Sequence, residues 1–190
     1  MKIKNLLKPD NWWILILSGV IAYMLFMIYS EPEYNKAFNF ILPGLTITFL
    51  STFISFIIAL FLGLISGIGR ISKNKFARTI SRTYIEFIRG VPVLILIFTI
   101  AFVVVVRAAE FFNINNGNVP MLVRAIIALS VFYGAYIAEV FRAGIESVPV
   151  GQREGGASLG LSERQVMRHI VLPQAFRNML PALGNDFISM

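Results

Sequence analysis

Residues 37–69 read AFNFILPGLTITFLSTFISFIIALFLGLISGIG, and none of these side chains is acidic or basic. A helix needs roughly 20 apolar residues to cross a bilayer. Further uncharged stretches occupy residues 11–30, 90–106 and 125–138. The last one is long enough if Arg124 and Glu139 lie at the two interfaces and extend toward water. The sequence therefore predicts an all-α, polytopic membrane protein with four membrane helices, near 12–29, 43–68, 91–106 and 121–141.

The composition agrees with a membrane fold. Of the 190 residues, 57% are hydrophobic and 14% are charged, whereas a soluble domain carries about 25% charged residues. The chain has no cysteine and one histidine, His169, so we expect no disulfide framework, no metal site and no cofactor. Residues 30–33 follow the first uncharged stretch without a small-x-small cleavage site, so we interpret that stretch as an uncleaved anchor.

The basic residues are distributed unevenly along the chain, whose net charge is +7. They gather before residue 10, in segment 70–89 and in segment 142–190, while the loops near residues 31–36 and 107–110 are poor in them. Basic loops that alternate in this way obey the positive-inside rule. The amino terminus and segments 70–89 and 142–190 are therefore predicted to face the cytoplasm, with residues 31–42 as an outer loop that ends at Pro43.

Small and polar side chains recur at helical spacing in two of the predicted membrane helices. Gly63-x-x-x-Gly67 and Gly134-x-x-x-Ala138 favour close helix–helix packing. A second interpretation is that polar side chains of these helices line a substrate path. Glu139 is either a functional intramembrane acid or the partner of Arg142 in an interfacial ion pair. The candidates for the substrate path are Thr48, Thr52, Ser55, Tyr133 and Tyr136.

A distinctive motif follows the last predicted membrane helix. Residues 151–173 read GQREGGASLGLSERQVMRHIVLP, which predicts two short helices joined by a tight turn. Gly160 suits the left-handed position after the first helix, with Leu161 packing back on it. Ser162 and Gln165 have the spacing of a capping box that opens the second helix. Pro173 is expected to end or kink that helix.

This motif resembles the EAA loop of ABC importer permeases. That loop runs Glu-Ala-Ala, three residues, Gly, nine residues and Ile-x-Leu-Pro, and Glu154, Gly160, Ile170, Leu172 and Pro173 stand at the matching positions here. Glycines at 155 and 156 replace the two alanines. Because two glycines cost a helix roughly 2 kcal/mol relative to alanine, we expect the first short helix to be weakened and the coupling looser.

Three further segments look like those of polar amino acid permeases, namely residues 84–92, 133–144 and 174–185. The resemblance covers residues 41–190 and implies a MetI-like permease domain, with the EAA loop at about 149–173. Residues 1–40 then form an amino-terminal cytoplasmic segment, an extra membrane helix and an outer loop. The resemblance also implies about two more membrane helices after Met190, so we expect the chain to be incomplete at its carboxyl terminus.

The resemblance implies a permease subunit that carries amino acids, polar ones above all, across the bacterial cytoplasmic membrane. Its implied partners are a dimer of ATPase subunits, a second permease subunit, identical or different, an extracytoplasmic substrate-binding protein and the lipid bilayer. The chain has no phosphate-binding loop, so ATP hydrolysis would belong to the partner and this subunit is not an enzyme. The residues implied at the ATPase contact are Glu154, Gly155, Gly156, Gly160 and Leu161, and Ile170, Leu172 and Pro173 would join the loop to the membrane part.

Two other classes of protein fit parts of the sequence. Residues 157–170 also resemble a helix-turn-helix, which would make the chain a membrane-anchored DNA-binding protein. Segment 142–180 has only a small excess of arginine over glutamate, which is too weak for gripping phosphates, so no nucleic-acid partner is expected. An ATP-independent channel or secondary transporter would leave the motif at 151–173 without a role.

Overall fold

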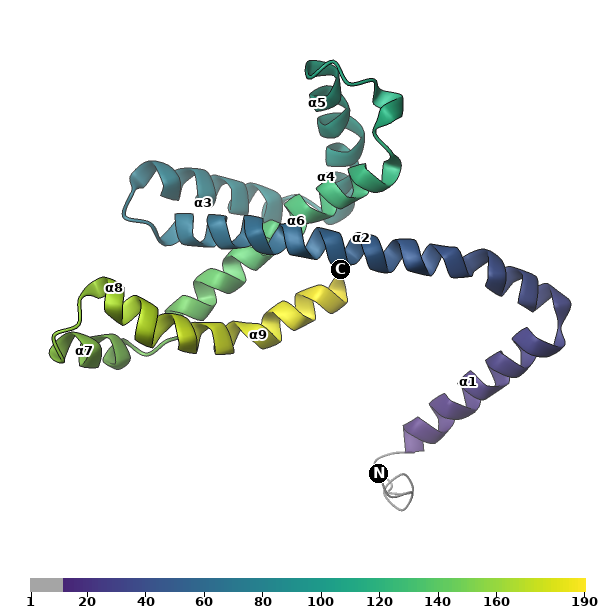
Figure 1. Ribbon diagram of the computed structural model, residues 1–190, viewed down its shortest axis with the longest axis horizontal. Helices are drawn as coiled ribbons and strands as arrows, with labels where there is room; N and C mark the ends of the chain where they lie inside the picture. The colour runs from purple at the N-terminus through teal and green to yellow at the C-terminus, as the bar shows by residue number, and fades with distance from the viewer. Residues whose placement is uncertain (1–11) are drawn as a thin grey trace. The chain divides into compact units, whose positions relative to one another are not determined.

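The computed structural model describes residues 12–190, apart from the side chain of Asn116. Residues 12–190 are built from helices and the turns that connect them, as Figure 1 shows. The prediction of an all-α chain is therefore confirmed. The predicted amino-terminal cytoplasmic segment and its lysines lie outside the described residues. The chain divides into two compact units, Met1–Phe49 and Leu50–Met190.

The first unit contains helix α1 (Trp12–Ser30) and the beginning of helix α2 (Pro32–Ile71). We expected an outer loop over 31–42 and a helix beginning at Pro43. That expectation is wrong, because α2 already begins at Pro32 and Pro43 lies inside it. Pro32 occupies the first helical position, where a missing N–H costs nothing. A proline inside a long apolar helix is tolerated when neighbouring groups adapt locally.

In the second unit, α2 is followed by a short turn and helix α3 (Lys75–Gly90). The side chain of Asn74 caps α3 by accepting hydrogen bonds from the backbone N–H groups of Phe76 and Ala77. The turn brings α3 back against α2. The two helices approach so closely that a Cβ built on Gly69 would lie 2.1 Å from Ser81 Oγ. Helix α3 thus occupies most of the basic segment 70–89.

Val91 is extended and Pro92 opens the next helical run. This run lies at 93–111 and is longer than the predicted 91–106. It consists of α4 (Val93–Thr99), a π-helical turn η3 (Ile100–Val104) and α5 (Val105–Phe111). A 3-10 turn η4 (Asn116–Asn118) then leads to α6 (Met121–Glu146), which Pro120 opens.

After α6 the chain forms α7 (Val150–Ser158), α8 (Glu163–Val166), a π-helical turn η5 (Met167–Val171) and α9 (Leu172–Ser189). Helix α9 runs back along α6, which Figure 1 shows as the yellow and green ribbons. By length and composition, α1, α2, the run 93–111 and α6 are each apolar enough to cross a membrane. The four predicted membrane helices are all present, with longer bounds.

Helix α6 is the centre of the packing in the second unit. One group of buried side chains, including Ile137 and Phe141, joins α6 to α2 and α9, and another, including Ala128 and Phe132, joins it to the run 93–111. Glycine is needed at two positions of α2, because a Cβ added there would strike α6. A Cβ added to Gly63 would lie 2.5 Å from Ile137 Cγ2, and a Cβ added to Gly67 would lie 2.9 Å from the Ala138 carbonyl oxygen. The two small-residue pairs therefore serve helix packing, which lets α2 and α6 approach to backbone contact.

Candidate functional site

The hairpin of α7 and α8 is built by the turn that the sequence predicts. Gly160 has φ +79°, the left-handed conformation in which a side chain would be strained. Its N–H donates to the Ala157 carbonyl at 2.9 Å, and the N–H of Leu161 donates to the Gly156 carbonyl at 3.2 Å. These are the two hydrogen bonds of a Schellman motif, which fix the direction in which the chain leaves α7.

The second half of the hairpin opens with a capping box. Ser162 Oγ accepts a hydrogen bond from the Gln165 N–H at 3.4 Å, and Gln165 Oε1 accepts one from the Ser162 N–H at 2.9 Å. Two backbone donors that would otherwise lack partners are thus satisfied. With the Schellman bonds before it, the segment from Gly156 to Gln165 is held by local interactions, as predicted.

Gly156 has a packing role that the sequence did not reveal. A Cβ at this position would lie 2.6 Å from Ile170 Cδ1 and 3.0 Å from Val166 Cγ2, whereas a Cβ on Gly155 would meet nothing within 4 Å. The hydrogen side chain of Gly156 therefore lets α7 lie directly against the second arm of the hairpin. The helix is complete over Val150–Ser158. That the two glycines weaken α7 and loosen the coupling stays a prediction.

Polar side chains tie α7 to the two long helices beside it. Arg153 Nη2 donates to the carbonyl oxygen of Ile145, near the end of α6, at 2.8 Å. On the α9 side, Gln174 Nε2 donates to Gln152 Oε1 of α7 at 3.3 Å. Asn178 Nδ2 of α9 donates to Ser147 Oγ, just after the end of α6, at 2.9 Å. Sequence reasoning missed these contacts, because their partners lie 8, 22 and 31 residues apart along the chain.

The second arm of the hairpin continues into α9 without ending at Pro173. Between them lies the π-helical turn η5, whose helical turn is wider than that of an α-helix. In it the N–H of Leu172 donates to the carbonyl oxygen of Met167, five residues back. Because proline lacks an N–H and its ring clashes with the carbonyl four residues before it, a wider turn accommodates Pro173. Val166 and Val171 are buried in the hairpin core, while Leu172 and Pro173 are exposed, and Ile170 reaches toward Gly156.

The outward face of α7 mixes charge with exposed apolar side chains. Glu154 and Gly155 are exposed, and Val150 and Leu159 expose 67% and 82% of their surface. At the base of the second arm, Lys73 Nζ lies 2.8 Å from Glu163 Oε2, and this lysine lowers the pKa of Glu163.

A cluster of charged side chains crosses the helices next to the hairpin. The carboxylate of Glu139 on α6 pairs with three guanidinium groups. The N···O distances are 2.8 Å to Arg70 of α2, 3.8 Å to Arg89 of α3 and 2.9 Å to Arg142 of its own helix. The guanidinium of Arg89 also lies 5.3 Å from the ring centre of Tyr136. Glu139 is thus paired as the second interpretation proposed, with two additional arginines that the sequence spacing did not reveal.

The five side chains proposed for the substrate path are on α2 and α6 and have different local contacts. Ser55 is buried, and its hydroxyl donates to the Ile126 carbonyl at 3.4 Å, so it packs α2 against α6. Tyr136 lines a cleft with Arg70 and Arg89, and Tyr133 donates to the backbone oxygen of Ser189 at 2.7 Å. Thr48 lies in the first unit and donates to the Gly44 carbonyl at 2.9 Å, and Thr52 is half-buried on α2.

The hairpin and its membrane helices match a known family. Residues 59–190 match the family described as "Binding-protein-dependent transport system inner membrane component". The chain belongs to this permease family. The resemblance drawn from residues 151–173 is therefore confirmed, and this family assignment favours a transport function over the DNA-binding alternative.

Individual relatives of this permease point in the same direction. It is 37% identical over 147 residues to the L-cystine transport system permease protein TcyB of Bacillus subtilis, covering 77% of this chain and 59% of that one. It is 36% identical over 163 residues to the probable amino-acid ABC transporter permease protein YckA of the same species, covering 86% and 69%. The permease thus spans between about three fifths and two thirds of the length of these relatives.

A solved structure confirms the fold of the permease. The crystal structure of an amino acid ABC transporter with histidines superimposes with a TM-score of 0.73 at 35% sequence identity. The match covers 83% of this chain and 70% of the other. The expected MetI-like permease fold is confirmed, and the family and the apolar helices identify a multi-pass protein of the inner membrane.

Proposed function

We propose that this chain is a permease subunit of an ATP-driven importer of amino acids, and that α7 is the segment through which a separate ATPase moves it. The family assignment supports the transport role. The names of the similar proteins, which include permeases for L-cystine and for glutamate, support an amino acid as cargo. The partners are then an ATPase dimer, a second permease subunit and a substrate-binding protein on the outer side.

The distribution of charge supports the orientation of the subunit. The turn between α2 and α3 and the hairpin of α7 and α8 are joined by the ion pair of Lys73 and Glu163, which supports a location of both on one side of the membrane. Both belong to basic segments, which favours the cytoplasmic side and a cytoplasmic amino terminus. In this arrangement residues 1–40 precede a permease domain at 41–190, and α7 faces the compartment that contains ATP.

The observation that carries the proposal is the construction of the hairpin. Its turn is fixed by Gly160, its two arms touch at Gly156, and its outward face exposes Glu154 and Leu159. A segment that is internally rigid and exposes apolar and charged groups is suited to dock in a groove of another protein. Gly155 is exposed beside Glu154, and we propose that it belongs to the contact with the ATPase, while Leu161 packs back on the core and supports the turn from within.

Displacement of α7 would reach the membrane helices through polar contacts and buried side chains. The hydrogen bond from Arg153 to Ile145 connects α7 with the end of α6, and the bond between Gln152 and Gln174 connects it with α9. Val171 is buried between the hairpin and these helices. We propose that these contacts act together with Ile170, Leu172 and Pro173, so that docking on one side rotates α6 and α9 together.

The experiment that tests this proposal is co-purification of the ATPase with the tagged chain from membranes. Glu154→Arg inverts the charge of the docking face, and Gly160→Pro is incompatible with φ +79° because proline fixes φ near −65°. Both variants are expected to lose the ATPase while they still insert into the membrane. Glu110→Arg, which inverts the charge of an exposed acid on α5 outside the proposed contact, is the matched control and should retain it. Undiminished ATPase recovery with both variants would contradict the docking role of α7.

A further inference from the structure

A polar cleft lies where α2, α3 and α6 meet, beside the ion pairs of Glu139. Its volume is about 390 Å³, and pockets for small molecules occupy roughly 300–1,000 Å³. The lining combines two arginines, an acid and a tyrosine with two uncharged residues of α3, namely Arg70, Ile85, Glu86, Arg89, Gly90 and Tyr136. Charges of both signs therefore border one hollow, and they come from different helices.

Arg89 is held more loosely than the other arginines around Glu139. Its Nη1 lies 3.8 Å from Glu139 Oε2, which is beyond hydrogen-bonding distance, whereas Arg70 Nη1 donates to the same oxygen at 2.8 Å. The guanidinium of Arg89 lies 5.3 Å from the ring centre of Tyr136, and 40% of the arginine side chain is exposed. Glu139 thus leaves the N–H donors of Arg89 available to a ligand in the cleft.

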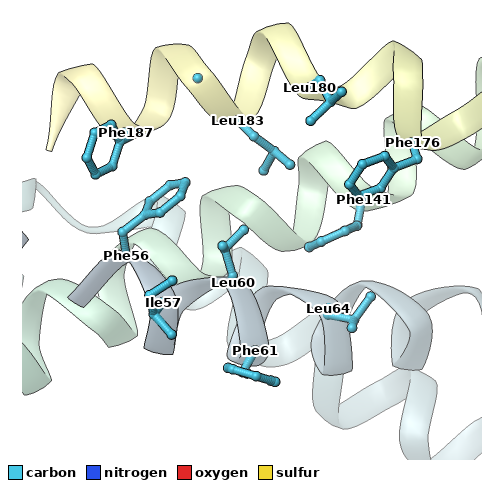
Figure 2. A pocket seen from close by; sticks show the side chains of 11 residues that line it. Phe56, Ile57, Leu60, Phe61, Leu64, Phe141, Phe176, Leu180, Leu183 and Phe187 are labelled. Atoms are coloured by element: carbon cyan, nitrogen blue, oxygen red, sulfur yellow. The ribbon is translucent and has the colours of Figure 1, made fainter. Parts of the chain in front are cut away.

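A second hollow of the same unit has a different chemistry. Figure 2 shows this groove, which is lined by aromatic and aliphatic side chains of α2, α6 and α9, among them Phe56, Phe141 and Phe187. Among the described residues that line it, none has a polar side chain. A free amino acid carries a carboxylate and an ammonium group, and burial of either charge without a partner is costly. The cleft at Arg89 fits such a ligand better, because it offers both cations and an acid.

We propose that Arg89 binds the carboxylate of the transported amino acid as the cargo passes the cytoplasmic ends of α2 and α6. This inference rests on the proposed function, which makes amino acids the cargo and places these helix ends at the cytoplasm. A guanidinium can bind a carboxylate through two parallel hydrogen bonds. Glu86 borders the same cleft, so it attracts the ammonium group of an amino acid and repels an anion that lacks one. The ring of Tyr136 holds the guanidinium in position.

The test measures binding to the purified complex of permease and ATPase subunits without the substrate-binding protein, so that the affinity reports the permease. Vesicles with the complete transporter first show which of the twenty radiolabelled L-amino acids are imported with ATP. Equilibrium binding of one imported amino acid is then competed with the unlabelled free acid and with its carboxamide, which lacks the carboxylate charge. In the wild type the carboxamide is expected to bind about tenfold or more weakly, because a charge-assisted hydrogen bond is lost.

Substitution of Arg89 should affect the two ligands differently. In Arg89→Gln the Kd of the free acid is expected to rise about tenfold or more, while the Kd of the carboxamide stays the same. A structural defect would instead weaken both ligands alike. Arg107→Gln, which removes an exposed arginine of α5 outside the cleft, is the matched control and should bind both ligands as the wild type does.

Four outcomes would contradict these assignments. An unchanged Kd of the free acid in Arg89→Gln, or an equal loss for both ligands, would overturn the carboxylate site. A wild-type complex without saturable binding of an imported amino acid would overturn it as well. Less co-purifying phospholipid in Arg89→Gln, at an unchanged Kd, would assign Arg89 to a lipid headgroup instead. A wild-type transporter that imports none of the twenty amino acids would refute the proposed function itself.

Discussion

Glu139 Oε2 accepts a hydrogen bond from Arg70 Nη1 at 2.8 Å, which joins α6 to α2 across 69 residues of sequence. Both side chains are largely buried, with 21% and 23% of their surface exposed. The same carboxylate also contacts Arg89 and Arg142, so one acid holds three helices together next to the hairpin.

Removal of this acid should weaken the packing of the membrane helices. Glu139→Gln leaves Arg70 and Arg142 without their carboxylate, and we expect a loss of about 3 kcal/mol in the free energy of unfolding. Glu86→Gln is the matched control, because its pair with Arg82 is exposed and should contribute no more than about 0.5 kcal/mol. Thermal unfolding in detergent measures both variants. Equal melting temperatures of Glu139→Gln and Glu86→Gln would show that the ion pairs of Glu139 do not stabilise the fold.

The two adjacent glycines of α7 should respond oppositely to alanine. Gly155→Ala is expected to stabilise the helix by about 1 kcal/mol, because the new Cβ meets no atom and alanine is the better helix former. Gly156→Ala should be less stable than the wild type by about 1–3 kcal/mol, because its Cβ would overlap Ile170 Cδ1. Hydrogen exchange of the α7 amides reports the difference.

A second substitution checks the cause of the expected loss. Ile170→Val removes the Cδ1 atom that the alanine at 156 would strike, so it should recover much of the lost protection in the double variant. The same change alone should cost about 0.5–1.5 kcal/mol, as is usual for this substitution. If Ile170→Val fails to restore Gly156→Ala, the contact between the two arms of the hairpin does not limit residue 156.

The ion pair between Lys73 and Glu163 should respond to pH and salt. The folded-state pKa of Glu163 is lowered by Lys73, so its contribution to stability is present above the unfolded pKa and is lost as pH falls through the folded value. NMR titration of Glu163 should show that Lys73→Gln raises this pKa toward its ordinary value and that high salt does the same. Lys75→Gln, which removes a nearby lysine outside this pair, should have a smaller effect. An identical pKa in the two variants would mean that Lys73 is not the cause.

Tyr84 should stabilise the contact between α3 and α6. Its hydroxyl donates to the Val131 carbonyl at 2.6 Å, and burial raises the pKa of Tyr84 to about 12. Because the folded value exceeds the unfolded one near 10, the stabilisation is complete below about pH 10 and is lost as pH rises through 12. We expect Tyr84→Phe to lose about 1 kcal/mol at pH 7.

Comparison of melting temperatures at pH 7 and pH 11 tests this assignment. The gap between wild type and Tyr84→Phe should be clear at the lower pH and should shrink at the higher one. Tyr29→Phe, at a tyrosine that is 90% exposed, should match the wild type at both values. A gap of constant size would show that ionisation of Tyr84 does not couple to folding.

Much of the fold and the shape of the hairpin follow from local sequence. Uncharged stretches must become helices in a bilayer, because a helix satisfies its own backbone hydrogen bonds. Gly160, Ser162 and Gln165 likewise act on backbone groups within a few residues, so their spacing is enough to predict the turn and the cap. The beginning of α2 was less predictable, because proline opens a helix at residue 32 and is accommodated inside it at residue 43.

Only the tertiary structure decides which distant residues meet. The three arginines around Glu139 and the packing of Gly156 on Ile170 depend on where α2, α3, α6 and the hairpin lie beside one another. Spacing along a chain determines local geometry because bonded neighbours share a backbone. Contacts between helices instead arise from packing of whole surfaces, which no single stretch of sequence contains.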